Sequence, residues 1–412
     1  MNLVEFLNNS PSSYNAIDSI KKILDENHYV ELDERDAYAL DKGGKYYIIR
    51  NGSSVMAFNV GNNLENPSLQ LTASHSDCPS FVLKPNCCSY EGGYFKLNTE
   101  VYGGVTFYSW LDRPLSIAGR IIYREDGSVK SCSYKYDKPF CLIPSVAIHM
   151  NREVNTNLNL NPQVDMLPMV SLEKGDILSF LKEDSGKDVL SYDLFLYPVN
   201  SAYLWGKNDE FITGNHLDDL QCAYNCLMGF IDSFNDNNIN VYCCFDNEEI
   251  GSSTRQGADS DFLFTNLNRI CNSLNIDYYR LLARGFMLSC DNAHALHPNH
   301  NEKHDALNRP SMNKGIVIKH ETRAYTSDGL SIGYLKDLLE RHDIPYQYFA
   351  NRSDSRGGST LGNISNNHSS MLSVDVGLAQ LAMHSCVETA GNLDNDYMVE
   401  AVKAFYSESL IK

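Results

Sequence analysis

Positive charge is in short supply in this chain of 412 residues. It has 34 lysine and arginine residues against 52 aspartate and glutamate residues, a formal net charge of −18 at pH 7. Such a surface repels phosphate groups, so we expect neither nucleic acid nor an anionic membrane surface as a partner. Long hydrophobic runs are also missing. No stretch approaches the roughly 18 apolar residues of a membrane span, and we expect no membrane-embedded part.

Cysteine is present, but without the Cys-x-x-Cys spacing. The twelve cysteines are scattered along the chain and include two adjacent pairs. We therefore expect reduced, mostly buried thiols and no disulfide framework. The first ten residues have neither a basic start nor the long apolar core of a secretory signal peptide. Both observations predict a cytoplasmic protein.

Alternating strands and helices indicate an α/β fold with an insertion. With 43% hydrophobic and 21% charged residues, the chain is long enough for two globular domains. Residues 1–88 and 207–412 alternate between β-branched runs and helical periodicity. This alternation predicts a mixed, largely parallel sheet with helices on both faces. Residues 89–206 have short aromatic and β-branched runs between turns such as Asp126-Gly127, which predicts an inserted, mostly β domain.

The clearest chemical signal comes directly after one strand-like run. The apolar residues 241–245 lead straight into Asp246-Asn247-Glu248-Glu249. Such a run is typical of a strand buried on both faces, and carboxylates at its end are unfavourable unless a cation meets them. The acidic stretch contains no lysine or arginine, and the next one along the chain is Arg255. A divalent metal is therefore a candidate for the missing positive charge.

Other polar side chains are expected at the same edge of the sheet, because ligands of open α/β sheets gather beyond the carboxyl ends of the strands. The residues placed there, or at a helix start close by, are His75, Asp77, Asp218, Glu248, Glu249, Asp291 and His384. Two imidazoles and several carboxylates form a nitrogen and oxygen ligand set. Such a set suits zinc, manganese or cobalt and does not suit an iron–sulfur cluster.

Each of these residues also has a structural explanation when it is taken alone. Asp218 could be an acidic residue favoured in the first turn of a helix, and His384 could be a core histidine. Three histidines resemble a metal cluster in composition: His294, His297 and His300. We expect such histidines to contact the substrate or the metal-binding side chains more often than the metal itself. Without a metal site, all these structural explanations would have to apply at the same time along one sheet. The metal site is therefore the favoured interpretation.

The joint pattern resembles the aspartyl aminopeptidase family of dinuclear metallo-aminopeptidases over nearly the whole chain. The most specific motifs are Asp246-Asn-Glu-Glu-Ile-Gly251 and Asp291-Asn-Ala-His-Ala-Leu-His-Pro298. The weaker matching pieces are Ser74-His-Ser-Asp-Cys-Pro79, Ile143-Pro-Ser-Val-Ala-Ile-His149, Leu217-Asp-Asp-Leu220, Gly315-Ile-Val-Ile-Lys319 and Met383-His-Ser385. The resemblance implies an exopeptidase that hydrolyses the N-terminal residue from peptides.

The resemblance further implies two metal ions in each subunit. His75 and Asp291 would hold one ion. Glu249 and His384 would hold the other, and Asp218 would bridge both. Zinc is the expected metal, with manganese or cobalt as alternatives. Two ions held about 3.5–4 Å apart can act on one water molecule or oxyanion.

It also implies catalytic roles for residues that bind no metal. Glu248 would be the general base, since a divalent ion lowers the pKa of a bound water to about 7, where a glutamate can accept its proton. Asp77 would orient the imidazole of His75. His149 would reach the site of a neighbouring subunit and help stabilise the tetrahedral intermediate, unless it only packs at an interface. The inserted domain 89–206 would mediate dimerisation, and the dimers would assemble into a homo-oligomeric dodecamer.

Substrate choice is expected to depend on positive charge in the pocket. The activity for which the family is named removes N-terminal aspartate or glutamate, and Lys319 is the candidate that would bind this carboxylate. Arg356, in a glycine-rich loop, is an alternative cation, and His297 is expected to contact the substrate. A net charge of −18 gives an acidic peptide no long-range attraction, so its recognition would have to be local.

Two other functions are compatible with part of this pattern. A dinuclear metallo-carboxypeptidase or deacylase would apply the same metal chemistry to a different amide bond. A non-catalytic assembly protein would keep the fold and lose Glu248 or a ligand, yet every one of these positions is filled. The sequence therefore favours a metallo-aminopeptidase.

Overall fold

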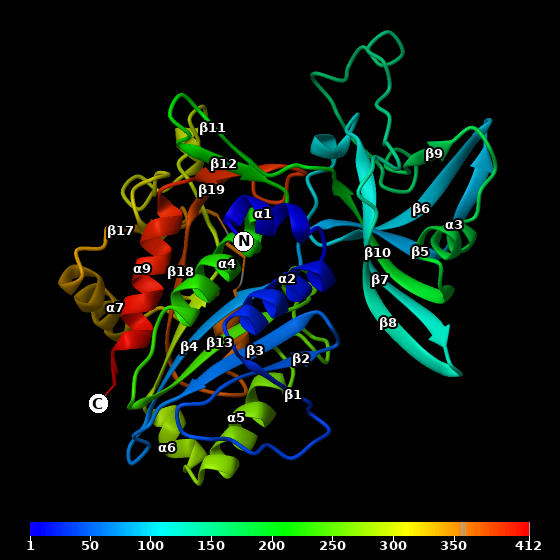
Figure 1. Ribbon diagram of the computed structural model, residues 1–412. Coiled ribbons are helices and arrows are strands. Elements are labelled where there is room, and N and C mark those ends of the chain that lie inside the picture. The colour runs from blue at the N-terminus through cyan, green and yellow to red at the C-terminus, as the bar shows by residue number, and fades with distance from the viewer. Residues whose placement is uncertain (356, 359, 412) are drawn as a thin grey trace.

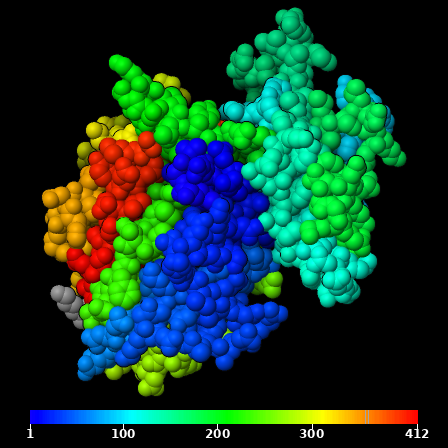
Figure 2. Space-filling view, viewed as in Figure 1, coloured from blue at the N-terminus to red at the C-terminus, as the bar shows by residue number. Residues whose placement is uncertain are grey.

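The computed structural model describes residues 1–355, 357–358 and 360–411, so Arg356 lies outside the described residues. Figure 1 shows two lobes, one with helices packed around a large sheet and one built mainly of strands. Both ends of the chain belong to the first lobe. Figure 2 shows the second lobe, in cyan and green, against the blue N-terminal segment of the first. Among the described residues, no helix has the length and apolar character needed to cross a bilayer.

A nine-stranded mixed sheet forms the centre of the first lobe. In spatial order its strands are β1 (Val30–Leu32), β2 (Lys45–Arg50), β3 (Ser54–Val60), β13 (Asn238–Phe245), β4 (Ser68–His75), β14 (Gly285–Cys290), β18 (Leu372–Gly377), β16 (Ile316–His320) and β17 (Tyr346–Ala350). The four central strands β13, β4, β14 and β18 run parallel to one another. β3 pairs antiparallel with β2 and β13, and β16 pairs antiparallel with β18. The mixed, largely parallel sheet predicted from the sequence is confirmed.

The strands β13 and β4 lie at the centre of the sheet, where β13 is mainly apolar and β4 alternates between apolar and polar residues. Every residue of both strands is buried, as expected for strands that have helices on both faces. The helices whose apolar residues pack on one face are α2 (Ser13–Glu26), α4 (Leu217–Ile231), α7 (Gly329–Arg341) and α9 (Asp394–Ser407). The helices on the other face are α5 (Phe262–Leu274) and α6 (Tyr278–Ala283). The remaining helices of this lobe are the short α1 (Leu3–Asn9) and α8 (Leu361–Ser365).

The second lobe is a six-stranded antiparallel sheet with its own core. Its strands, in spatial order, are β8 (Ser128–Lys135), β7 (Leu115–Glu125), β10 (Asp188–Pro198), β5 (Ser80–Glu91), β6 (Tyr94–Tyr102) and β9 (Met169–Ser171). The helix α3 (Ile177–Ser185) packs against this sheet through Ile177 and Leu181. The strands of this sheet thus come from residues 80–198. A division of the chain into 1–88 with 207–412 and an inserted 89–206 remains a proposal.

A third sheet was not foreseen from the sequence. It contains β11 (Tyr203–Trp205), β12 (Phe211–Gly214), β20 (Glu388–Gly391), β19 (Ala379–Leu381) and β15 (Ala293–His294), in that spatial order. These strands have two to four residues each, too few for an alternating pattern to be recognised. The sheet matters for the site, because the turn between β19 and β20 carries His384.

The packing of α4 on the central sheet gives a direct test of the fold. Phe230 on α4 is fully buried and lies 5.6 Å from Tyr29 and 5.2 Å from Tyr406 between ring centroids. Phe230→Ala should lower stability by about 3–5 kcal/mol, because it removes buried contacts and leaves a cavity. The matched control Phe234→Ala, at a side chain that is 41% exposed, should change it by about 0.5 kcal/mol or less. Thermal unfolding of the two variants checks this, and equal shifts would contradict the packing.

Candidate functional site

Three neighbouring parallel strands bring the predicted site residues together. β13 pairs in parallel with β4, with Phe245 opposite His75, and β4 pairs in parallel with β14. Carboxyl ends of parallel strands meet at one edge of a sheet, where ligands are usually bound. His75 ends β4, the acidic turn at Glu248 and Glu249 follows β13, and Asp291 follows β14.

Asp218 lies between two groups of possible metal ligands. It enters from the first turn of α4, and its side chain is buried. Its Oδ1 is 3.5 Å from Nε2 of His75, and its Oδ2 is 3.6 Å from Nε2 of His384. One group that could hold an ion consists of His75, Asp218 and Asp291, and a second consists of Asp218, Glu249 and His384. A third, overlapping group joins His75 with Glu248 and Glu249.

Buried oxygen atoms without partners show that this donor set fits divalent metal ions. Oδ1 of Asp218 and Oε1 of Glu249 are buried and accept no hydrogen bond from any described residue. Burial of a carboxylate oxygen without a donor or a cation is strongly unfavourable. The carboxylates and imidazoles are the ligands that zinc, manganese and cobalt accept. The residues present therefore fit the metal ions expected at this edge.

The pKa values show the same shortage of positive charge. Burial raises the pKa of Glu248 to about 7, and the carboxylates of Asp291 and Asp77 contribute to the rise. Burial also raises the pKa of Asp291 to about 6, although Lys319 opposes the rise. The pKa of Glu249 lies well above its ordinary value because of burial and the charge of Asp218. A nearby cation favours ionised carboxylates, so it would lower all three.

Asp77 holds the acidic turn in place. Its Oδ1 accepts a hydrogen bond from the backbone N–H of Glu248 at 3.0 Å, and its Oδ2 accepts one from Glu249 at 3.1 Å. Nδ1 of His75 is 3.0 Å from the backbone carbonyl oxygen of Asp77 and 3.4 Å from its Oδ1. The imidazole is therefore oriented mainly through the backbone of Asp77, while the carboxylate organises the turn. Hydrogen bonds of this kind fix the orientation of metal ligands.

Glu388 is a positioning residue that the sequence analysis missed. Its side chain is buried, its Oε2 accepts the backbone N–H of Asp218 at 2.9 Å, and its Oε1 accepts that of His384 at 2.7 Å. One carboxylate thus fastens two of the predicted ligands to β20. Glu388 itself belongs to no recognised motif, so only its position shortly after Met383-His-Ser385 could have drawn attention to it.

The second lobe also contacts the site. The hydroxyl of Tyr102, at the end of β6, donates a hydrogen bond to Oδ2 of Asp77 at 2.7 Å. Gly103 has a φ of +71°, and a Cβ atom there would lie 3.1 Å from Cβ of Glu249. Nδ1 of His384 is 3.2 Å from the carbonyl oxygen of Gly104. The end of β6 and the two glycines that follow it therefore pack against residues of the site.

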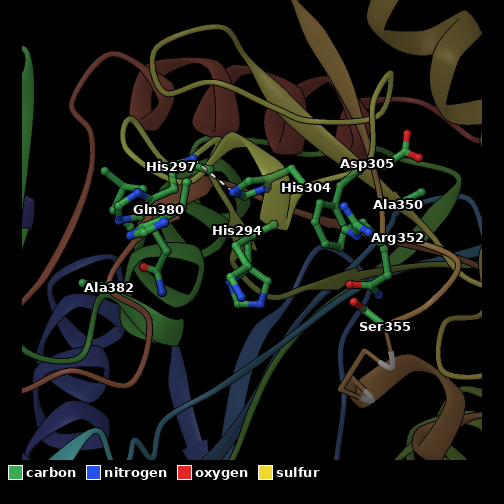
Figure 3. A pocket seen from close by; sticks show the side chains of 15 residues that line it. His294, His297, His304, Asp305, Ala350, Arg352, Ser355, Gln380 and Ala382 are labelled. Atoms are coloured by element: carbon green, nitrogen blue, oxygen red, sulfur yellow. Dashed lines mark hydrogen bonds between the residues drawn. The ribbon is translucent and has the colours of Figure 1, made fainter. Parts of the chain in front are cut away.

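The predicted substrate residues lie in different places. Lys319 is buried in a cavity of about 520 Å³ that the predicted metal ligands also line. Its Nζ is 3.2 Å from Oδ2 of Asp291. His297 lines a second cavity of about 330 Å³, shown in Figure 3. His149 is exposed, and it is not one of the described residues that line either cavity.

Comparisons with known proteins agree with this architecture. The model of the family "Aminopeptidase I zinc metalloprotease (M18)" matches residues 6–406. The chain is 42% identical to a probable M18 family aminopeptidase 2 of Clostridium novyi over 422 residues, which covers 98% of both chains. A probable M18 family aminopeptidase 2 of Clostridium acetobutylicum is 40% identical over the same length, again with 98% of both chains covered.

Solved structures share the fold. The cryo-EM structure of the Ape4 and Nbr1 complex contains a chain that is similar with a TM-score of 0.95 and 30% identity, covering 98% of this chain and 84% of that one. The S. cerevisiae mApe1 dodecamer is similar with a TM-score of 0.88 and 25% identity, covering 99% of this chain and 96% of that one. The family model and these relatives span nearly all of the sequence. The chain therefore belongs to the M18 family of zinc metallo-aminopeptidases, hydrolases that act on peptides as exopeptidases.

Proposed function

We propose that this protein removes an N-terminal aspartate or glutamate from peptides, using two divalent metal ions in each subunit. The observation that carries the proposal is the position of Asp218 between two groups of metal ligands, one on the side of His75 and the other on the side of His384. A single carboxylate shared in this way is suited to bridge two ions. Zinc is the proposed metal, and manganese and cobalt are the alternatives to be compared.

We propose for the two ions the same ligands that the sequence predicts. His75 and Asp291 would hold one ion, Glu249 and His384 the other, and Asp218 both. The ions would supply the Lewis acidity that activates a water molecule and polarises the scissile carbonyl group. This ligand assignment leaves Glu248 without a metal.

Glu248 is proposed as the general base. Burial raises its pKa to about 7, and the two ions would lower it from there, so that Glu248 would be ionised and able to accept a proton near neutral pH. Asp77 keeps the turn in place through the backbone N–H groups of Glu248 and Glu249. Glu248 would take a proton from the water that attacks the carbonyl carbon and then deliver it to the leaving amine. It would thus act in both halves of the reaction.

Lys319 is proposed to select the acidic side chain of the substrate. It is a buried cation beside the metal ligands, and the ring of Tyr325 lies 5.2 Å from its Nζ. Its hydrogen bonds to Asp291 and to the carbonyl oxygen of Asn292, both at 3.2 Å, fix the ammonium group in one position. A fixed buried ammonium favours a carboxylate over a neutral side chain. Arg356 remains an alternative for this role and His297 a further proposed contact.

A panel of substrates tests the proposed specificity. Aminoacyl substrates with Asp, Glu, Leu, Lys and Ala are assayed with zinc, manganese and cobalt, together with an Asp substrate whose N-terminus is acetylated. The acidic substrates should have a kcat/KM at least about tenfold above that of Leu, since a charged hydrogen bond contributes about 1.5–3 kcal/mol. The acetylated substrate should not be hydrolysed. A preference for Leu or Lys would contradict the role of Lys319, and cleavage of the acetylated substrate would indicate a deacylase or another hydrolase.

The metal content of two variant proteins separates the roles of Glu248 and Asp218. Glu248→Gln keeps the shape of the side chain and should retain both ions, but it should lose hydrolysis by about 10²–10⁴-fold because the base is missing. Asp218→Ala should lose both metal and activity, because it removes the shared ligand. Elemental analysis and peptide assays of the two purified variants provide the comparison. Loss of one ion in Glu248→Gln would instead make Glu248 a ligand, as the group of His75, Glu248 and Glu249 allows.

We also propose that subunits assemble through the inserted domain into dimers and a dodecamer, with His149 reaching a neighbouring site. A dodecamer is known for the similar S. cerevisiae mApe1. The segment around His149 supports an interface, since Val146 is 52%, Ile148 50% and Met150 83% exposed, and exposed apolar patches mark association surfaces. A cytoplasmic location is proposed as well. All twelve cysteines lie in the described part of the chain as free thiols, which suits a reducing compartment.

Mixed oligomers test the proposed role of His149. His149→Ala and Glu248→Gln subunits should each be inactive alone. Hetero-oligomers assembled from both should recover part of the activity, because some sites combine an intact Glu248 with an intact His149 from the neighbour. Mixtures of Glu248→Gln with Asp218→Ala provide the control and should stay inactive, since both changes damage the same site. Absence of recovery in oligomers shown to be mixed would count against the role across the interface.

A further inference from the structure

A second cavity adjoins the one with the metal ligands. It has a volume of about 330 Å³, and both cavities are lined by His294 and Phe349. The two rings lie 6.0 Å apart between centroids and so form a shared wall. Figure 3 shows the imidazoles of His294, His297 and His304 around this cavity, with Arg352 across from them. We call this cavity the histidine pocket.

The histidine pocket offers hydrogen-bond donors. Nε2 of His304 accepts the backbone N–H of His297 at 3.1 Å, and Nδ1 of His297 accepts that of Asn299 at 3.2 Å. In a neutral imidazole with one nitrogen accepting, the other nitrogen carries the proton. Nδ1 of His304 and Nε2 of His297 are therefore N–H donors, which suits an anionic ligand and does not suit a metal ion. In agreement, all three groups of possible metal ligands found among the described residues lie in the other cavity.

Charge in the pocket points to the same kind of ligand. Lys303 lines it and forms no ion pair with any described residue. Arg352 also lines it and is held by Asp354 through hydrogen bonds of 2.9 and 2.7 Å. Asp305 also lines the pocket, and its Oδ1 accepts the backbone N–H groups of Leu307 and Asn308. Lys303 is the cation left to meet a ligand from outside.

Lys319 does not serve for a second carboxylate. Its buried ammonium group bonds to Asp291 and to the carbonyl oxygen of Asn292, and its one remaining donor is assigned to the side chain of the N-terminal residue. With a net charge of −18 the protein also offers no long-range attraction to acidic peptides. A carboxylate further along the peptide therefore needs a local cation of its own. Because His294 and Phe349 line both cavities, the part of a peptide that extends beyond the metal cavity is the part that can reach the histidine pocket.

We infer that the histidine pocket binds a carboxylate one or two residues beyond the scissile bond, with Lys303 as its cationic anchor. This inference rests on the proposed aminopeptidase reaction at the neighbouring metal cavity. The carboxylate can be the C-terminus of a dipeptide or tripeptide, or the side chain of an acidic residue in a longer peptide. The pocket would thus favour short or acidic peptides.

Four substrates with the same N-terminal residue distinguish these sources. They are a tripeptide with a free C-terminus, its C-terminal amide, an amidated tripeptide with Asp in the second position, and a p-nitroanilide, which has no carboxylate after the scissile bond. In the unmodified protein the free acid and the Asp peptide should each have a KM about fivefold below that of the plain amide, the size expected for one partly exposed ion pair. The substrate whose KM falls below that of the plain amide identifies the source of the bound carboxylate. Equal KM values for the acid, the Asp peptide and the amide would overturn the inference.

Lys303→Met tests the anchor and keeps most of the aliphatic side chain. It should raise the KM of the carboxylate-bearing substrates about fivefold and leave kcat and the p-nitroanilide unchanged, whereas Lys303→Arg should restore the low KM. Lys22→Met, at an exposed lysine on α2, is the matched control and should change nothing. Unchanged KM values in Lys303→Met, or an equal rise for the p-nitroanilide, would overturn the inference. Because the p-nitroanilide reports the metal site alone, its hydrolysis separates failure of the pocket from failure of the proposed reaction.

Discussion

Negative charge buried at one edge of the central sheet is the constraint on which the site depends. Asp218, Glu249 and Asp291 crowd together there with two imidazoles, and two of their oxygens have no hydrogen-bond partner among the described residues. Such a cluster repels itself in a medium that screens charge poorly. Metal ions are the natural compensation in a family of zinc metalloproteases. Two further carboxylates, of Asp77 and Glu388, accept backbone N–H groups of the cluster and hold it together in a fixed arrangement.

The second lobe contributes to the site of its own subunit. Tyr102 from β6 donates to Asp77, and the backbone at Gly103 and Gly104 packs on Glu249 and His384. Both lobes therefore contact the residues of the cluster or those that hold them in place. This gives the inserted sheet a local role that is separate from the proposed role of His149 between subunits. A change in the second lobe can thus alter the metal site without touching a ligand.

Two cavities on either side of His294 and Phe349 suggest how recognition is divided. The buried Lys319 is bonded to Asp291, so it neutralises part of the buried acidic cluster in addition to its proposed role as a contact of the substrate side chain. Lys303 in the histidine pocket has no such partner among the described residues. In the proposed division, Lys319 would meet the N-terminal residue that is removed, and Lys303 would meet the remainder of the peptide. Local contacts of this kind have to overcome the unfavourable charge of the whole protein.

The sequence by itself indicated the central strands, the acidic turn after β13 and the residues proposed as metal ligands. Buried parallel strands have continuous apolar runs, and polar residues at their ends stand out against them. The same reasoning could not find Glu388 or the five-stranded sheet, because the strands are short and the hydrogen bonds go to backbone atoms far away in the chain. It also could not show that Lys319 is bonded to Asp291, or that His297 lines a separate cavity. These features arise where distant segments pack together, and no local pattern of residues records such contacts; only the tertiary structure decided them.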